Sequence, residues 1–333
     1  MSGFQSLARM VGRLRGSPPG QPQLSLVLIV YDMPEQAANT IRSLLPGYQR
    51  DVSGSEYELI VVENASSNTL SAGFLQDLPA NVHYHLRQNP EPSPAQAINF
   101  GASQAQGGAV CVMIDGARMV TPGVVCNLLA AHRSFPRAVV SIPGYHLGRE
   151  LQQTAVGSGY DRDTERDLLA SIAWPEDGYR LFDVACFSGS CRPGFFLPNS
   201  ESNCISIPLD VWHTLSGFNT LFDLPGGGLI NLDFYKRACE LPEVQHVIVP
   251  GEGTFHQFHG GVTTGGVSRE MREDYIERSR NQYRALRGAD FSSPRTSPVY
   301  LGAIPAQAQK FVHYSAARAL RSLGEAPLPD STA

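Results

Sequence analysis

The chain has 333 residues, of which 42% are hydrophobic and 17% are charged, and its formal net charge is −5. These proportions are typical of a globular protein with one large α/β domain or two small domains. The negative charge argues against a general nucleic-acid-binding surface, and no apolar run is long enough to span a bilayer. Six cysteines without a C-x-x-C pair predict free thiols, and with no recognisable signal peptide we expect a cytoplasmic protein.

The first 22 residues are predicted to form a basic leader and a linker. Arg9, Arg13 and Arg15 alternate with apolar residues at helical spacing, and residues 17–22 are rich in proline. A basic amphipathic helix of this kind could lie on a membrane surface or on a partner, which would make the protein membrane-associated. The alternative is a frayed leader helix without a partner.

Apolar runs alternate with helical patterns from residue 24 onward. Strands are predicted at 24–30, 57–62, 82–86, 110–114 and 138–142, with helices at 34–45, 93–106 and 122–132. This alternation predicts an α/β fold with a parallel sheet that helices cover on both faces. Residues 143–195 are irregular apart from a helix at 163–173. Order returns with strands at 203–207 and 246–249 and helices at 208–215, 230–240 and 269–287.

Acidic side chains follow two of the predicted strands. Asp115 is the first polar residue after the strand at 110–114, and Glu63 follows the strand at 57–62. Because ligands of open α/β sheets bind outside the carboxyl ends of the strands, we expect Asp115 at the lip of a ligand crevice. The alternative for Asp115 is a helix cap, but Thr121 and Pro122 are a better helix start. Glu63 could bind a ribose or a base, or it could belong to a solvated turn.

The second half of the chain supplies further candidates. Three glycines, 226–228, lead into a helix whose first turn carries Asn231 and Asp233. The simpler interpretation of Asp233 is that it stabilises the helix terminus. His256 and His259 stand between glycines beside Glu252 and could supply a metal ligand, although a single histidine is usually structural.

A basic amphipathic helix is predicted near the end of the chain, at residues 307–323. It carries Lys310, Arg318 and Arg321, and no acidic residue occurs from 291 to 324. Such a helix either contacts a membrane surface or packs on the domain.

Five segments, taken in chain order, resemble family 2 glycosyltransferases of the GT-A fold. They are LSLVLIVYDMPE, YELIVVENASSN, the stretch from Asn89 to VMIDGA, GFNTLFDLPGGGLINLDFYKRA and GEGTFHQFHGG. The resemblance covers roughly residues 24–265. It implies a GT-A domain at 23–265, preceded by the leader and followed by a C-terminal helical extension at 266–333.

The resemblance also implies roles for individual residues. Those that would bind the nucleotide-sugar donor, first of all a UDP-sugar, are Tyr31, Asp32, Glu63, Asn99, Asp115 and Arg118. Asp115 matches the first acid of the family's D-x-D motif, and with His256 or His259 it would hold Mn²⁺ or Mg²⁺. The acceptor would be a hydroxyl group of a glycan or small molecule in polysaccharide or glycoconjugate synthesis.

Two departures from the family pattern bear on the chemistry. Ala117 replaces the second acid of D-x-D, and Asn231 replaces the acidic base of the family. Asn cannot accept a proton as a base, so the base could be Asp233, the first candidate, or one of three other acids: Glu252, Asp223 and Glu201. Arg118 could supply charge that the metal site has lost. Alternatively, the chain is a catalytically silent GT-A module that binds a carbohydrate, a nucleotide sugar or a protein. A nucleotidyltransferase is a third and poorer option, because no Gly- and Lys/Arg-rich loop follows the first strand.

Overall fold

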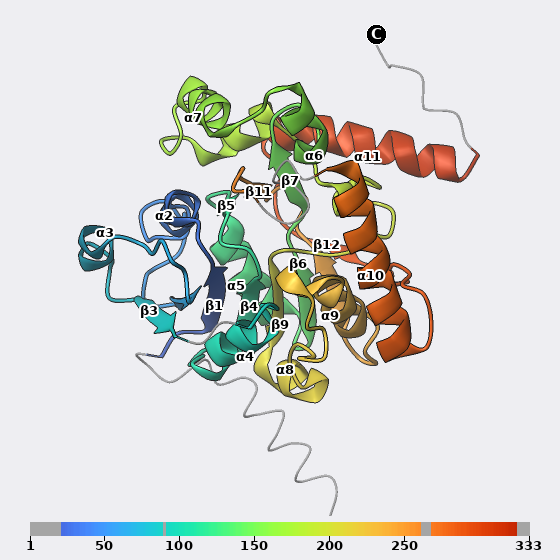
Figure 1. The fold of residues 1–333 in the computed structure, drawn as a ribbon, viewed down its shortest axis with the longest axis horizontal. Coiled ribbons are helices and arrows are strands. Elements are labelled where there is room, and N and C mark those ends of the chain that lie inside the picture. Colours follow the sequence, from blue (N-terminus) through green and yellow to red (C-terminus); the bar gives the residue numbers. More distant parts are fainter. Residues whose placement is uncertain (1–20, 89–90, 261–267, 325–333) are drawn as a thin grey trace, which may run out of the picture.

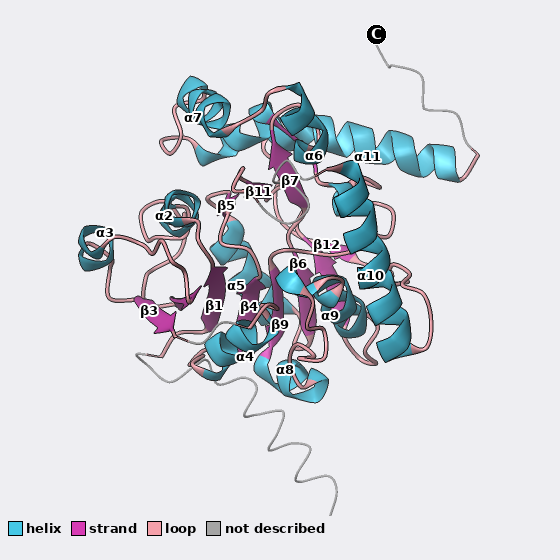
Figure 2. Cartoon of the chain, in the orientation of Figure 1, coloured by secondary structure: helices cyan, strands magenta, loops and turns pink. Residues whose placement is uncertain are grey.

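The computed structural model describes residues 21–88, 91–260 and 268–324. Two sheets and the helices around them form this part of the chain (Figures 1 and 2). The predicted basic leader helix lies outside the described residues, and so does the predicted domain boundary at 265.

The main sheet has eight strands in the order β12-β10-β6-β9-β4-β1-β2-β3. All of its neighbouring strands pair in parallel except at β9, which runs antiparallel to both β4 and β6. The predicted α/β fold with a mainly parallel sheet is therefore confirmed. The strands are β1 (Leu24–Val30), β2 (Tyr57–Asn64), β3 (Val82–Arg87), β4 (Ala109–Met113), β6 (Ala138–Ser141), β9 (Ile205–Pro208), β10 (Gln245–Ile248) and β12 (Val299–Tyr300).

Helices cover both faces of this sheet, and the side chains of β1 divide between them. Leu26 and Leu28 pack with α2 and α5 on one face, whereas Val27 and Ile29 pack with α4, α8 and α9 on the other. A strand buried on both faces is mainly apolar, which explains the apolar run 26–30. Ser25 is the polar exception, and its hydroxyl donates to Glu58 of β2 at 2.6 Å. The helices around the sheet are α2 (Pro34–Arg42), α3 (Ala72–Gln76), α4 (Ala95–Ser103), α5 (Val124–Ser134), α8 (Leu209–Leu215), α9 (Ile230–Cys239) and α10 (Arg269–Arg287).

A second sheet of four strands was not predicted. Its order is β5-β11-β7-β8, formed by β5 (Arg118–Val120), β11 (Thr254–His256), β7 (Gly144–Leu147) and β8 (Ala185–Phe187). Two of these strands lie in the region 143–195, which the sequence analysis treated as irregular. Strands of three or four residues are too short to show a hydrophobic period, so the sequence pattern could not reveal them.

Aromatic side chains form the core beside this small sheet. Tyr145 stacks between Phe187 and Phe255, with ring centroids 5.0 and 5.1 Å away, and Phe311 from α11 packs edge-on at 4.7 Å. The helices near this sheet are α6 (Gln152–Ala155), α7 (Arg162–Ser171) and α11 (Gln309–Ser322) (Figure 1). Short 3-10 turns occur at Val156–Ser158, Gly178–Val184, Gly189–Cys191, Pro225–Gly227 and Ala306–Ala308.

The segment predicted as a C-terminal extension contributes to both sheets. β12 pairs with β10 at the edge of the main sheet, and α11 buries Phe311 against the small one. Of the two alternatives for the basic tail helix, the described part shows packing on the domain. Among the described residues, no helix is both long and apolar enough to cross a membrane.

Candidate metal and donor site

The carboxyl ends of three neighbouring strands bring the predicted acidic residues to one edge of the main sheet. β1 lies between β2 and β4, with Val30 opposite Glu63 and Leu28 opposite Met113. Asp115 follows Met113 by two residues, so it lies level with Val30 and Glu63. Strands are about 4.8 Å apart, which puts the backbones at Glu63 and Asp115 roughly 10 Å from each other.

Asp115, His256 and His259 form a cluster at this edge, as the sequence predicted. Asp115 Oδ2 lies 3.1 Å from His256 Nε2, and Oδ1 lies 3.7 Å from His259 Nε2. The two Nε2 atoms are themselves 3.1 Å apart. One potential ligand atom from each residue falls within 4.8 Å of the others, which is the geometry of a three-residue metal site.

The protonation of this cluster also suits a cation. Burial raises the pKa of the Asp115 carboxyl, but His259 and His256 outweigh it, and the pKa lies well below its usual value. Burial lowers the pKa of His256 to about 4, although Asp115 acts in the opposite direction. At neutral pH the cluster therefore offers a carboxylate and a neutral imidazole, the forms that bind metals.

Gln152 orients His256 and was missed by the sequence analysis. Its carbonyl oxygen accepts a hydrogen bond from His256 Nδ1, and its Nε2 donates to the backbone oxygen of His256 at 2.8 Å. A proton held on Nδ1 leaves the lone pair of Nε2 directed at Asp115 and His259. Gln152 lies within residues 143–195, which the sequence pattern predicts to be irregular, and nothing local in the sequence marks it.

Arg118 enters the site from β5, next to His256 on β11. Its Nε lies 3.5 Å from Asp115 Oδ2, and the residue is only 8% exposed. Its Nε and one terminal nitrogen have no hydrogen-bond partner among the described residues. A buried guanidinium with unused donors is suited to bind an anion such as a phosphate.

Glu63 is completely buried at the end of β2. Its Oε2 accepts hydrogen bonds from the Leu70 amide and the Tyr84 hydroxyl, at 3.2 and 3.0 Å. Its Oε1 has no partner among the described residues. An unused carboxylate oxygen at this edge can accept a hydrogen bond from a ligand.

Tyr31 and Asp32 form the turn after β1. Tyr31 is 54% exposed. Asp32 adopts a φ of +50° and accepts hydrogen bonds from Ser67 Oγ and the Asn68 amide, both at 2.9 Å. The Asp32 carboxylate thus connects the turns after β1 and β2, while the Tyr31 ring is free to contact a ligand.

Asn99 does not fit the donor-binding role predicted for it. Its amide nitrogen donates to the Phe218 carbonyl, and its oxygen accepts from the Phe218 amide, both at 2.9 Å. Both polar ends of the side chain are used to attach α4 to the loop before the three glycines. The residue is structural, which sequence spacing could not reveal because Phe218 is remote in the chain.

Asp233 does not fit the role of base either. It is 1% exposed, and its carboxylate accepts hydrogen bonds from Arg237 at 2.8 Å and from Arg287 at 2.6 and 2.7 Å. A carboxylate held by two guanidinium groups is a weak proton acceptor. The simpler interpretation from the sequence, that Asp233 stabilises its helix, agrees better with this geometry.

Glu252 is a structural residue at the start of α5, which corrects its predicted place in the catalytic set. It is 3% exposed and accepts hydrogen bonds from the Thr121 hydroxyl, the Gly123 amide and the Tyr179 hydroxyl. These donors satisfy a buried carboxylate at a helix N-terminus, where negative charge is stabilising.

Asn231 lies beside Glu201, which was one of the alternative bases. Asn231 Nδ2 donates to Glu201 Oε2 at 2.9 Å, and Asn203 Nδ2 lies 3.5 Å from Glu201 Oε1. Asn231 and Asn203 are each 6% exposed, whereas Glu201 is only half-buried. Because β9 begins at Ile205 opposite Val112 of β4, Glu201 and Asp115 leave the same edge of the sheet.

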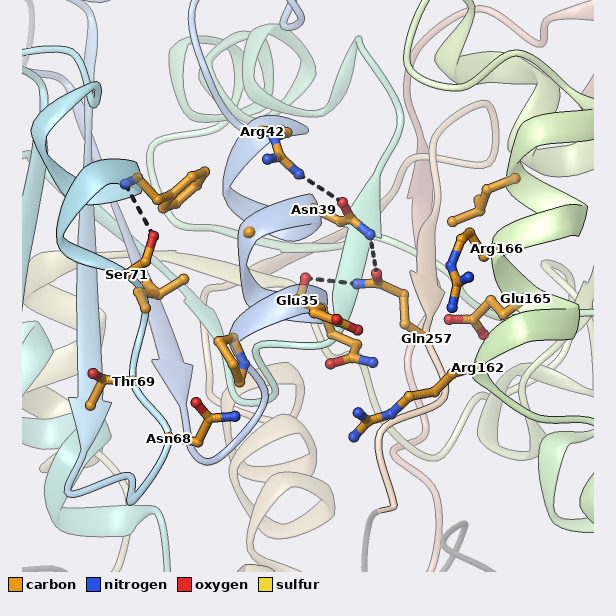
Figure 3. Close-up of a pocket in the computed structure, with 16 residues that line it drawn as sticks. Glu35, Asn39, Arg42, Asn68, Thr69, Ser71, Arg162, Glu165, Arg166 and Gln257 are labelled. Atoms are coloured by element: carbon orange, nitrogen blue, oxygen red, sulfur yellow. Dashed lines mark hydrogen bonds between the residues drawn. The ribbon is translucent and has the colours of Figure 1, made fainter.

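A groove of about 580 Å³ lies beside the histidines, between α2, α3 and α7 (Figure 3). Gln257 on its wall follows His256 and donates to the Gln36 carbonyl and the Thr40 hydroxyl on α2, at 3.0 and 3.1 Å. Asn39 donates to the Gln257 oxygen at 3.1 Å. These bonds hold the turn that carries His256 and His259 against α2.

Comparison with known proteins shows which family the N-terminal part of the main sheet resembles. The family profile described as glycosyl transferase family 2 matches residues 25–186. Residues 25–186 are a family 2 glycosyltransferase domain. Glu63, Asp115 and Arg118 lie within the match, whereas His256 and His259 come from the chain beyond it. The arrangement of strands and helices is the GT-A fold expected of this family.

Solved structures similar to this chain include S. aureus TarS 1-349 in complex with UDP-GlcNAc. It has 12% sequence identity and a TM-score of 0.48, over 91% of this chain and 73% of that chain. The mannosyltransferase PcManGT from Pyrobaculum calidifontis, in complex with GDP-Man and Mn²⁺, has 12% identity and a TM-score of 0.45, over 98% of this chain and 84% of that chain. No curated protein matches the sequence.

Proposed function

We propose that the protein transfers a sugar from a nucleoside-diphosphate sugar to a hydroxyl group of a glycan or small-molecule acceptor. The observation that carries this proposal is the cluster of Asp115, His256 and His259 at the carboxyl end of β4, inside a family 2 fold. A nucleoside diphosphate leaves with additional negative charge, and a cation in this cluster would neutralise it.

The donor set of the cluster favours Mn²⁺ over Mg²⁺. Two of its three ligands are imidazole nitrogens, which suit transition metals, whereas Mg²⁺ prefers oxygen ligands and keeps its water. When bound, the ion would act as a Lewis acid on the diphosphate. Ala117 offers no second carboxylate, and the unused donors of Arg118 would bind a phosphate oxygen in its place.

Glu63 and Tyr31 are proposed to hold the nucleoside end of the donor. The unpartnered oxygen of Glu63 would accept a hydrogen bond from a ribose hydroxyl or a base imide. The exposed ring of Tyr31 would lie against the base, since aromatic rings stack on bases. A UDP-sugar is the first donor to test, in line with the sequence expectation.

Glu201 is proposed as the base that takes the proton of the acceptor hydroxyl. Its carboxylate is held by two neutral amides, and no cation bonds to it among the described residues. An unneutralised carboxylate keeps its ability to accept a proton, unlike Asp233. Asn231 then acts as a positioning residue for Glu201.

The experiment is a thermal-shift panel of UDP-, GDP-, dTDP- and CMP-sugars with Mn²⁺, Mg²⁺ or EDTA, followed by assays of donor hydrolysis and transfer. A ligand at a hundredfold excess over its Kd stabilises the folded state by about 2.7 kcal/mol, which a shift in Tm detects. We expect one donor to raise the Tm with Mn²⁺ more than with Mg²⁺, and EDTA to remove the shift. A donor that binds without any hydrolysis or transfer would favour the silent module, and no binding of any donor would contradict the proposal.

A further inference from the structure

A second groove, of about 600 Å³, lies on the far side of the small sheet from β5. We call it the α11 groove. It is lined by β8, by the loop and helix α6 that follow β7, and by one face of α11. The lining residues are Arg149, Glu150, Leu151, Thr154, Ala185, Cys186, Phe187, Arg192, Lys310, Phe311 and Tyr314.

Positive charge predominates in the α11 groove. Arg149, Arg192 and Lys310 are exposed on it, against a single acid, Glu150. None of the three cations forms a salt bridge with a residue in the described part of the chain. Partial burial lowers the pKa of Lys310, although Asp183 acts in the opposite direction. The groove is therefore a place where an anion would be stabilised.

The floor of the groove is aromatic. Phe187 and Phe311 pack with ring centroids 4.8 Å apart, and Tyr314 lies 5.5 Å from Phe187 and is 36% exposed. Lys310 Nζ lies 5.0 Å from the centroid of the Phe311 ring. Phe187 and Phe311 are buried, so Tyr314 supplies the exposed aromatic surface, and such a surface next to cations suits a ligand that has both apolar ring faces and negative groups.

The backbone of β8 adds hydrogen-bonding groups to the groove. β8 is the edge strand of the small sheet, and the flanking bonds from Ser188 N to Gly144 O and from Gly148 N to Val184 O fix its register. In an antiparallel pair such bonds recur at every second residue, so the backbone groups of Ala185 and Phe187 point away from β7. Hydroxyl groups of a ligand can bond there, whereas three residues are a short template for an added peptide strand.

The α11 groove lies close to the candidate metal site. Cys186 on its wall is opposite His146, which is opposite His256 on β11. Two inter-strand spacings of about 4.8 Å therefore separate the groove wall from a proposed metal ligand, about 10 Å in all. Gln152, which orients His256, directly follows Leu151 of the groove.

We propose that the α11 groove binds an anionic glycan, a chain of sugar units that carries negatively charged groups. The bound chain is the acceptor or a neighbouring part of it. This inference rests on the proposed function, because a groove whose wall lies some 10 Å from a proposed metal ligand would hold acceptor units remote from the reacting hydroxyl.

Cys186 provides a local measure of occupancy that does not depend on catalysis. It is half-buried on the groove wall, and Cys126 is a half-buried thiol elsewhere that serves as an internal control. The full chain is treated with iodoacetamide at pH 8.5, and alkylation of each thiol is followed by mass spectrometry. The probes are dextran sulfate and neutral dextran of matched length, poly-glutamate, and phosphatidylglycerol vesicles.

We expect dextran sulfate to slow alkylation of Cys186 at least fivefold and to leave Cys126 unchanged, with neutral dextran, poly-glutamate and vesicles giving less than twofold. R192A/K310A should lose the protection. R318A/R321A removes the same charge from positions that do not line the groove and should keep it. Protection that persists in R192A/K310A, or equal protection by any other probe, would overturn the inference.

Failure of the groove and failure of the proposed function are distinguishable. Protection of Cys186 without donor turnover would support glycan binding in the α11 groove and contradict the proposed transferase activity. Metal-dependent turnover without protection of Cys186 would support the transferase activity and contradict glycan binding in the α11 groove.

Discussion

Two aspartates of this protein were both candidates for the reaction and have opposite surroundings. Asp115 follows a buried strand and faces two imidazoles, while Asp233 opens a helix and faces two guanidinium groups. The imidazoles can stay neutral and share a cation with Asp115. The guanidinium groups are permanently charged and close Asp233 to any further partner. The comparison teaches that the groups opposite a carboxylate, rather than its place in the fold, decide whether it is available for chemistry.

The largest expected effect comes from removing the charge of Asp115. D115N keeps the shape of the side chain but weakens the metal cluster, so we expect donor turnover to fall about 1,000-fold, since a bound metal supplies several kcal/mol of stabilisation to the transition state. Initial rates over a Mn²⁺ titration measure this. D210N, at an exposed ion pair with Arg137, is the control and should retain wild-type rates. Turnover and Mn²⁺ dependence that survive in D115N would contradict the assignment.

The next effect tests whether Glu201, a carboxylate that no cation neutralises, accepts the proton of the acceptor hydroxyl. E201Q should lower transfer about 100-fold and leave the donor Kd unchanged, because a general base contributes a factor of 100 to 10,000. The double variant E201Q/N231D returns a carboxylate to position 231, beside the amide at 201, and should recover at least tenfold in kcat.

Full transfer activity of E201Q, or no recovery in the double variant, would remove Glu201 from the reaction. The matched control is D223N, at another acid that the sequence left open as a base. Its carboxylate accepts a hydrogen bond from Gln282 at the exposed surface. We expect D223N to transfer at the wild-type rate.

For Asp233, which two arginines neutralise, we expect a substitution to lower the stability of the fold and to leave the activity unchanged. D233N leaves Arg237 and Arg287 without their anion and should lower the free energy of unfolding by about 2–3 kcal/mol, less than for a fully buried pair because the arginines are partly exposed. Urea unfolding measures this. D210N should change it by less than about 1 kcal/mol. An unchanged midpoint for D233N, or a large loss of donor affinity in the folded protein, would break the comparison.

The smallest effect per residue is a pH dependence that involves neither aspartate. Burial lowers the pKa of His132 and His246 to about 4, below the usual 6.5. As the pH falls from 6.5 toward 4, the unfolded chain binds protons that the folded chain does not, so stability is lost over that window. We expect about 2 kcal/mol less stability at pH 5.0 than at pH 7.5 for each histidine, by urea unfolding. H132Q should flatten the dependence, and an equally steep curve for H132Q would contradict it.

The sequence predicted what local pattern and residue chemistry determine. β1 and β2 were found because a strand buried on both faces is a continuous apolar run, and Asp115 was placed at the crevice because the run ends there. The small sheet was missed because its strands are short, and with it Gln152. The sequence could not predict that two arginines neutralise Asp233, because Arg287 lies 54 residues further along the chain and only the fold brings the two together. Residue type therefore identified the candidate ligands, but it could not separate carboxylates that are available to a ligand from those that arginines neutralise.

The aromatic stack around Tyr145 has a consequence for the order in which the protein is made. Phe255 in that stack directly precedes His256, and Phe311, from the last described helix, packs against the same ring. During synthesis from the N-terminus, the ribosome releases strands β1, β2 and β4 long before either residue. The candidate metal site should therefore gain its last packing contacts only after Phe311 has been synthesised, so a nascent chain stalled before residue 309 would hold the histidine turn through bonds such as those of Gln257 to α2, without the Phe311 contacts.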